Sequence, residues 1–147
     1  MAWLAGLSPL PIVLKGITRA EDAVLAHEHG AAGIIVSNHG GQGLAHAVPV
    51  AEALPAIVDA TQGNVEVLVD GGIRSGLDVL RALALGARAV LVARPILWGL
   101  TVAGPQGVEG VVTSLRDEFD TSMALTGCTA IEDIDDAVFL PRRNPQP

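Results

Sequence analysis

The chain has 147 residues, of which 50% are hydrophobic and 17% charged, and its formal net charge is −7. This composition predicts one domain with an apolar core, excludes a largely disordered chain, and argues against nucleic acid as the main partner, because phosphate backbones require a basic surface. No apolar stretch reaches the roughly 18 residues of a membrane helix, and the single cysteine, Cys128, favours a cytoplasmic location and excludes an internal disulfide framework.

Four short apolar runs predict β-strands, at residues 12–14, 33–36, 65–69 and 89–92. Each run is rich in β-branched residues and is bounded by Gly, Pro, Asp or Arg. Three of the four are almost continuously hydrophobic, which predicts parallel strands that are covered on both faces.

Helical patterns alternate with these strands. Four are predicted: one from the capping-box pair Thr18 and Glu21 to Gly30, and three over 50–61, 76–85 and 108–125. Pro55 is expected to split the second helix, and Ser75 to cap the third. A second capping box, at Thr129 and Glu132, predicts a short final helix.

Strand and helix in alternation predict an α/β fold of βαβ units with right-handed crossovers. We expect one domain over residues 1–140, followed by a polar, proline-rich tail over 141–147. The long Gly- and His-rich connection at 38–49 follows a strand, and loops of that length more often carry functional residues than serve only to connect two elements.

Ligands of parallel α/β folds bind beyond the carboxyl ends of the strands, and each predicted strand ends in polar residues there. The third and fourth ends supply Gly71 and Gly72, which allow a tight turn, and two cations, Arg74 and Arg94. Helices follow both ends, and their N-termini attract anions. These features predict a phosphate site; the alternative is that the glycines are ordinary turn residues and the arginines are solvated.

Lys15 and His39 stand at the first two strand ends. Lys15 either stabilises negative charge that develops on a ligand, or it extends to solvent or pairs with Asp70 without such a role. His39 is placed to act as a general base, the alternative being a histidine satisfied by local backbone. The other histidines and Cys128 are expected to be surface and structural residues, and no metal site is predicted.

Together the segments 10–17, 35–41, 69–74 and 93–95 resemble the family of FMN-dependent 2-hydroxy acid oxidases and dehydrogenases. The resemblance implies a flavoprotein with a (β/α)₈ TIM barrel, of which these four strands would be the second half. It also implies oxidation of an L-2-hydroxy acid to the 2-keto acid, with FMN as the cofactor that accepts two electrons.

The resemblance further implies a role for each residue at the strand ends. His39 would be the catalytic base, and Asp70 would hold and polarise it. Lys15 and Ser37 would contact the flavin. Asp70 would also belong to the cofactor site. The ribityl phosphate would be held by the residues that follow Asp70 and by the dipeptide after the fourth strand: Gly71, Gly72, Ile73, Arg74, Ala93 and Arg94.

Three positions depart from the family pattern, and the mildest change is Ala93, which replaces a glycine at the phosphate site. Gln42 stands where an arginine would clamp the substrate carboxylate, and Ala45 replaces an acidic residue. The first half of the family sequence is absent, which predicts self-association or a complementing N-terminal half. Two other hypotheses remain: a truncated, non-catalytic remnant that binds FMN or another phosphorylated ligand weakly, and a generic phosphate-binding module.

Overall fold

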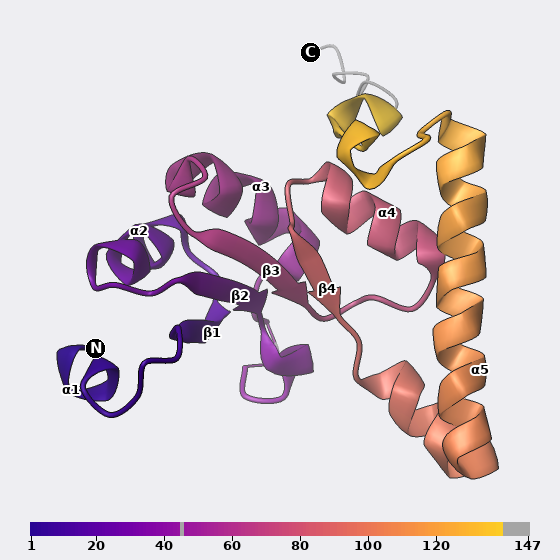
Figure 1. The fold of residues 1–147 in the computed structure, drawn as a ribbon, viewed down its shortest axis with the longest axis horizontal. Coiled ribbons are helices and arrows are strands. Elements are labelled where there is room, and N and C mark those ends of the chain that lie inside the picture. The colour runs from indigo at the N-terminus through magenta and orange to yellow at the C-terminus, as the bar shows by residue number, and fades with distance from the viewer. Residues whose placement is uncertain (45, 140–147) are drawn as a thin grey trace.

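Four parallel strands form the sheet in a computed structural model that describes residues 1–44 and 46–139. They are β1 (Val13–Ile17), β2 (Gly33–Ser37), β3 (Glu66–Asp70) and β4 (Ala89–Leu91), and they lie side by side in chain order (Figure 1). The four predicted strands and their parallel arrangement are confirmed, although their boundaries shift. Ala45 and the tail over 141–147 lie outside the described residues.

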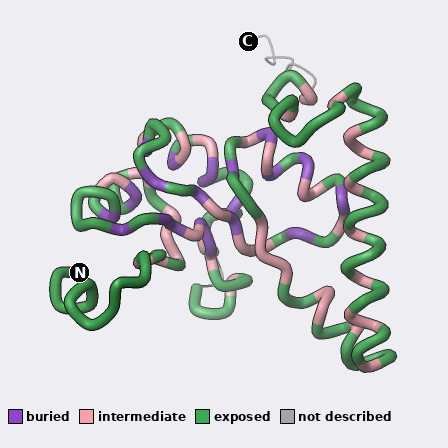
Figure 2. The backbone as a smooth tube through the Cα atoms, viewed as in Figure 1, coloured by how far each residue is buried: buried purple, intermediate pink, exposed green. Residues whose placement is uncertain are grey.

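Three helices connect consecutive strands: α2 (Ala20–Glu28), α3 (Val50–Thr61) and α4 (Gly76–Ala84). They lie along one side of the sheet (Figure 1) and cover the core. The fully buried side chains of this core include Ile34, Val36, Leu54, Ile57 and Leu80. Figure 2 shows the buried stretches of backbone among the strands and the helices that cover them. Apolar burial between a sheet face and amphipathic helices is the main stabilising term of such a layer.

The other face of the sheet is only partly covered. Ile35 and Leu68, which alternate with buried residues along β2 and β3, are half-buried. The expectation that the strands are covered on both faces is therefore wrong for this chain, because its helices α2 to α4 lie on one side. An apolar face left in contact with water favours a further packing partner.

A long C-terminal helix, α5 (Arg94–Thr126), follows β4 and stands beside α4 (Figure 1). Its backbone departs from helical angles at Ala103 and Gly104, so the helix consists of two segments, and the helix predicted over 108–125 is the core of the second. The two segments meet at Gly99 and Gly107, where a Cβ atom on either glycine would overlap the backbone of the other. Glycine is required at this crossing because no side chain fits between the two backbones.

Several local predictions are corrected. Arg19, and not Thr18, is the N-cap of α2, and Glu21 pairs with Arg19 at the exposed surface. Pro55 lies in the middle of a continuous α3, where it removes one hydrogen bond without splitting a helix whose apolar face is buried. Asp133, and not Glu132, accepts the hydrogen bonds from residues 129 and 130.

Four short helical turns complete the described residues: α1 (Ala2–Ala5) and the 3-10 turns His39–Gly41, Ile131–Asp133 and Asp136–Val138. Within the described part of the chain, no helix is both long and apolar enough to cross a bilayer.

Candidate active site

The polar strand ends meet at one edge of the sheet because all four strands run in the same direction. Ser37 at the end of β2 is paired in register with Asp70 at the end of β3. Lys15 lies in β1, next to a register shift at Gly16, whose φ is +101°. The ring of His39 packs over this glycine, since a Cβ on Gly16 would lie 2.8 Å from its Cε1 atom.

A buried serine hydroxyl organises this edge. Ser37 Oγ donates to Asp70 Oδ2 at 2.8 Å and accepts from Lys15 Nζ at 3.2 Å and from the backbone N–H of His39 at 3.1 Å. One donated and two accepted bonds fully use the capacity of a hydroxyl. The Ser37 residue is 1% exposed, so it is fixed in place, and it joins three candidate site residues from different strand ends.

Lys15 and Asp70 form a close ion pair, with 2.6 Å between Nζ and Oδ2. Burial opposes ionisation of Asp70, but hydrogen bonds from Lys15 and Ser37 and the charge of Lys15 outweigh it, so the pKa of Asp70 lies below its ordinary value. At neutral pH the Asp70 carboxylate is therefore ionised and can hold a neighbouring cation in position.

Acid is expected to destabilise the protein more than it destabilises the Asp70→Asn variant. Because the pKa of Asp70 is lowered by folding, its carboxylate contributes stability above the unfolded pKa of about 3.9, and this contribution is lost as pH falls through the folded pKa. Urea unfolding between about pH 6 and about pH 2 measures the loss. Asp22→Asn removes an exposed carboxylate of α2 and should lose unfolding free energy with falling pH as wild type does. If Asp70→Asn also loses as much unfolding free energy as wild type, the prediction is contradicted.

His39 occupies a strained position at the mouth of β2. Its φ is +53°, an uncommon value for a residue other than glycine, and it is followed by Gly40 and Gly41, which also have positive φ. Asn38 Oδ1 accepts from the N–H of Gly40 at 3.1 Å and stabilises the turn. Non-glycine residues held in such conformations cluster at functional sites, and this strain supports a functional role for the imidazole.

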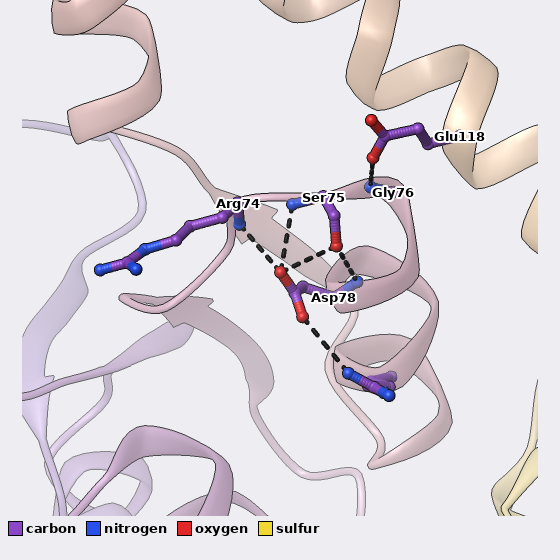
Figure 3. Close-up of polar contacts among 6 residues, drawn as sticks. Arg74, Ser75, Gly76, Asp78 and Glu118 are labelled. Atoms are coloured by element: carbon purple, nitrogen blue, oxygen red, sulfur yellow. Dashed lines mark hydrogen bonds and ion pairs between the residues drawn. The ribbon is translucent and has the colours of Figure 1, made fainter.

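The loop after β3 turns at Gly71 and Gly72, with φ of +119° and +84°, and leads into α4. Asp78 Oδ2 accepts from the N–H groups of Arg74 and Ser75, each at 3.1 Å (Figure 3). Glu118 of α5 accepts from the N–H of Gly76 at 2.9 Å. The α4 N-terminus was expected to attract an anion, but two carboxylates already occupy it.

The N-terminus of α5 is different. Its N-cap residue, Ala93, makes no side-chain capping bond, and Arg94 follows it directly. The Arg94 guanidinium lies beside Gly40, where a Cβ would be 3.6 Å from one of its nitrogens. An anion at this edge would therefore meet the Arg94 side chain, the start of α5 and the glycine turn of the β3 loop.

A cavity of about 380 Å³ joins these strand ends. Ten of the eleven site residues that the sequence predicts line it: Lys15, His39, Gln42, Asp70, Gly71, Gly72, Ile73, Arg74, Ala93 and Arg94. The remaining one, Ser37, is buried behind Lys15 and Asp70. Three cationic side chains and one carboxylate face the cavity, which suits an anionic ligand.

Sequence reasoning missed two residues that lie outside the cavity but hold the start of α4 beside it. Asp78 had a visible signal, the Ser-x-x-Asp capping pattern from Ser75, and the structure shows a complete capping box there. Glu118 had none, since it is 42 residues from Gly76 in the chain. Within the described part of the chain, no cluster of three or more His, Cys, Asp or Glu side chains is arranged to hold a metal ion.

Comparison with known proteins places this site in context. The model of a family described as FMN-dependent dehydrogenase matches residues 1–140. The chain is 55% identical to the L-lactate oxidase of Nostoc sp. over 135 residues, which are 92% of this chain and 37% of that protein. It is 52% identical to 2-hydroxyacid oxidase 1 of Homo sapiens over 143 residues, which are 97% of this chain and 38% of that protein.

Solved structures agree with these relatives. A mandelate oxidase mutant with a C4a-OH-FMN adduct superposes with a TM-score of 0.84 at 54% identity, over 86% of this chain and 39% of that one. The chain thus spans about two fifths of the length of the proteins that it matches.

Proposed function

Because the chain belongs to the family of FMN-dependent dehydrogenases, and its four strand–helix units are part of a (β/α)₈ barrel, we propose that it binds FMN and carries the catalytic base of a 2-hydroxy acid oxidase or dehydrogenase. The proposed reaction oxidises an L-2-hydroxy acid to a 2-keto acid. The observation that carries the proposal is that Lys15, His39 and Asp70 line the same cavity as the two arginines. The proposed functional unit is residues 1–140.

The cavity residues fit a flavin mononucleotide. A phosphate monoester carries negative charge, and Arg74 and Arg94 line the same cavity as the glycine turn at Gly71 and Gly72. No hydrogen bond joins the N–H of Gly72 or Ile73 to another described residue, so both remain available to phosphate oxygens. Lys15 would contact the ring, and Ser37 would act by holding Lys15 and Asp70.

The chemistry divides between cofactor and protein. When bound, FMN supplies the acceptor for two electrons. His39 would accept the proton released from the substrate at a ring nitrogen, as an imidazole can near neutral pH. Lys15 places a positive charge where negative charge would accumulate, and the Asp70 carboxylate keeps that ammonium in position at 2.6 Å.

Gln42 limits how well the proposed site can bind the carboxylate of the substrate. It lines the cavity, but its neutral amide cannot form the charge-assisted, bidentate pair that an arginine forms with a carboxylate. The substrate's carboxylate would therefore be bound weakly and oriented poorly by this part of the chain.

Gln42→Arg is expected to raise kcat/KM for a 2-hydroxy acid by about tenfold or more, because a hydrogen-bonded charged partner is worth roughly 1.5–3 kcal/mol. Steady-state oxidation of lactate and glycolate measures the change. Gln106→Arg adds the same charge to an exposed position of α5 away from the cavity and should leave the rate unchanged. An equal rate in Gln42→Arg and wild type would contradict the role given to Gln42.

Flavin absorbance of the purified protein, with and without added FMN, tests the proposed function. Stoichiometric flavin that a 2-hydroxy acid bleaches without oxygen supports the enzyme. Bound flavin that no hydroxy acid reduces favours the non-catalytic remnant, for which Gln42 is the specific observation. Failure to bind flavin, with saturable binding of simple phosphorylated ligands, favours the generic phosphate module.

The proposal includes a partner, either a second copy or a complementing N-terminal half. Among residues 1–44 and 46–139, the edge strands β1 and β4 each have one side without a strand partner, and Trp3, Leu97 and Trp98 are more than half exposed. Light scattering at low concentration should show a species larger than one chain, alone or after addition of the N-terminal half of a relative. A strictly monomeric, well-folded protein in both experiments would contradict association.

The proposed location is the cytoplasm.

A further inference from the structure

Glu118 lies outside the cavity, yet its carboxylate faces the start of α4 (Figure 3). Its Oε2 accepts from the N–H of Gly76 at 2.9 Å. Among residues 1–44 and 46–139, this is the one hydrogen bond that joins α5 to α4 or to the sheet. The backbones also touch there, since a Cβ on Gly76 would overlap the backbone nitrogen of Phe119.

Two carboxylates therefore hold three successive backbone N–H groups. Asp78, within α4, holds those of Arg74 and Ser75, and Glu118, from α5, holds that of Gly76. Asp78 is anchored in turn by Ser75 Oγ at 2.9 Å. In Figure 3 the Arg74 side chain points away from both carboxylates, and it lines the cavity.

This arrangement fixes the direction in which the loop leaves β3. Gly71 and Gly72 have positive φ and little intrinsic stiffness, so the loop needs an external constraint to present its amides in one orientation. Asp78 constrains the loop only relative to α4. Glu118 ties the start of α4 to a second helix by a hydrogen bond, which adds to the close backbone contact at Gly76 and orients loop and helix together against α5.

We propose that Glu118 is a positioning residue for the phosphate-binding loop, Gly71 to Ser75, and that it raises the affinity for the phosphate of the cofactor without touching it. The inference rests on the proposed function. A negative charge near a phosphate site otherwise opposes anion binding, so Coulomb repulsion and positioning make opposite predictions. Removal of Glu118 would strengthen phosphate binding if only its charge mattered, and would weaken it if its hydrogen bond positions the loop.

The experiment compares FMN with riboflavin, which has the same ring but no phosphate, by equilibrium titration of flavin fluorescence against the purified chain. Glu118→Ala should weaken FMN binding by about tenfold and leave riboflavin binding unchanged, since hydrogen bonds to charged groups contribute this order of effect. Glu118→Gln keeps an amide oxygen that can accept from Gly76, and it should recover most of the affinity. Asp120→Asn removes an exposed carboxylate of the same helix and should behave as wild type.

Hydrogen exchange of the Gly76 amide, measured without ligand, tests the structural premise separately. Exchange should accelerate in Glu118→Ala and not in Asp120→Asn. The inference is overturned if this amide stays protected, if FMN binding is unchanged or stronger, or if FMN and riboflavin weaken equally. If wild-type protein does not bind FMN more tightly than riboflavin, the proposed phosphate site itself fails, whatever the exchange data show.

Discussion

Gly76→Ala is expected to destabilise the protein by about 3 kcal/mol or more, one of the largest effects available in this chain. A Cβ at this position would overlap the backbone nitrogen of Phe119 and the backbone carbonyl carbon of Glu118. Backbone atoms cannot rotate away as a flexible side chain can, so α4 and α5 would have to separate. That movement would also lengthen the bond from the N–H of Gly76 to Glu118. Urea unfolding followed by circular dichroism measures the loss.

Gly110→Ala is the matched control for this substitution. Gly110 lies in the second segment of α5, and apart from its chain neighbours and the adjoining helix backbone no atom lies within 4 Å of the position that its Cβ would take. Alanine is favoured over glycine in a helix by roughly 0.8–1.0 kcal/mol, so this variant should be as stable as wild type or slightly more stable. Equal stability of the Gly76 and Gly110 variants would show that α4 and α5 do not pack as closely as the structure indicates.

His39→Asn is expected to lower the rate of flavin reduction by a 2-hydroxy acid by about 10²–10⁴, the usual contribution of a general base. Asparagine tolerates the positive φ of +53° at this position better than most residues, so the loop should keep its shape. Its amide cannot accept a proton at neutral pH. Anaerobic stopped-flow measurement of the flavin absorbance, on the flavin-loaded protein, gives the rate directly.

Binding of FMN separates loss of the base from loss of the cofactor site. His39→Asn should bind FMN with nearly wild-type affinity, because the two arginines and the glycine turn are unchanged. His46→Asn alters another exposed histidine of the same connection and should keep the wild-type rate, since it does not line the cavity. If His39→Asn reduces the flavin at the wild-type rate, His39 is not the general base.

The candidate cavity was predictable because strand direction alone brings its residues together. Each apolar run could be recognised from its neighbours, and parallel strands deliver the residues that follow them to one edge. Lys15, His39 and Arg94 come from three different strand ends, and all three line the same cavity. Their positions therefore required only the strand boundaries and the topology.

The partners of these residues were not predictable to the same degree. From the sequence, Asp70 is a partner either for Lys15 or for His39; the structure pairs it with Lys15 and with Ser37. Ser37 is assigned to the flavin by resemblance, yet it is buried and saturated by three hydrogen bonds. Side-chain orientation and burial select between such partners, and neither is encoded in residue spacing.

The parallel α/β architecture and the cavity edge follow from the amino-acid sequence, because hydrophobic periodicity and turn residues act over a few neighbouring positions. The family is indicated by the resemblance of the motifs at the strand ends. Tertiary packing was needed to reveal that α4 begins against Glu118, and that its N-terminus is bound by carboxylates and is not open to an anion. The physical reason is distance along the chain. The Ser37–Asp70 bond spans 33 residues and the Gly76–Glu118 bond spans 42, and contacts of that range form only when packed helices and strands bring the two groups together.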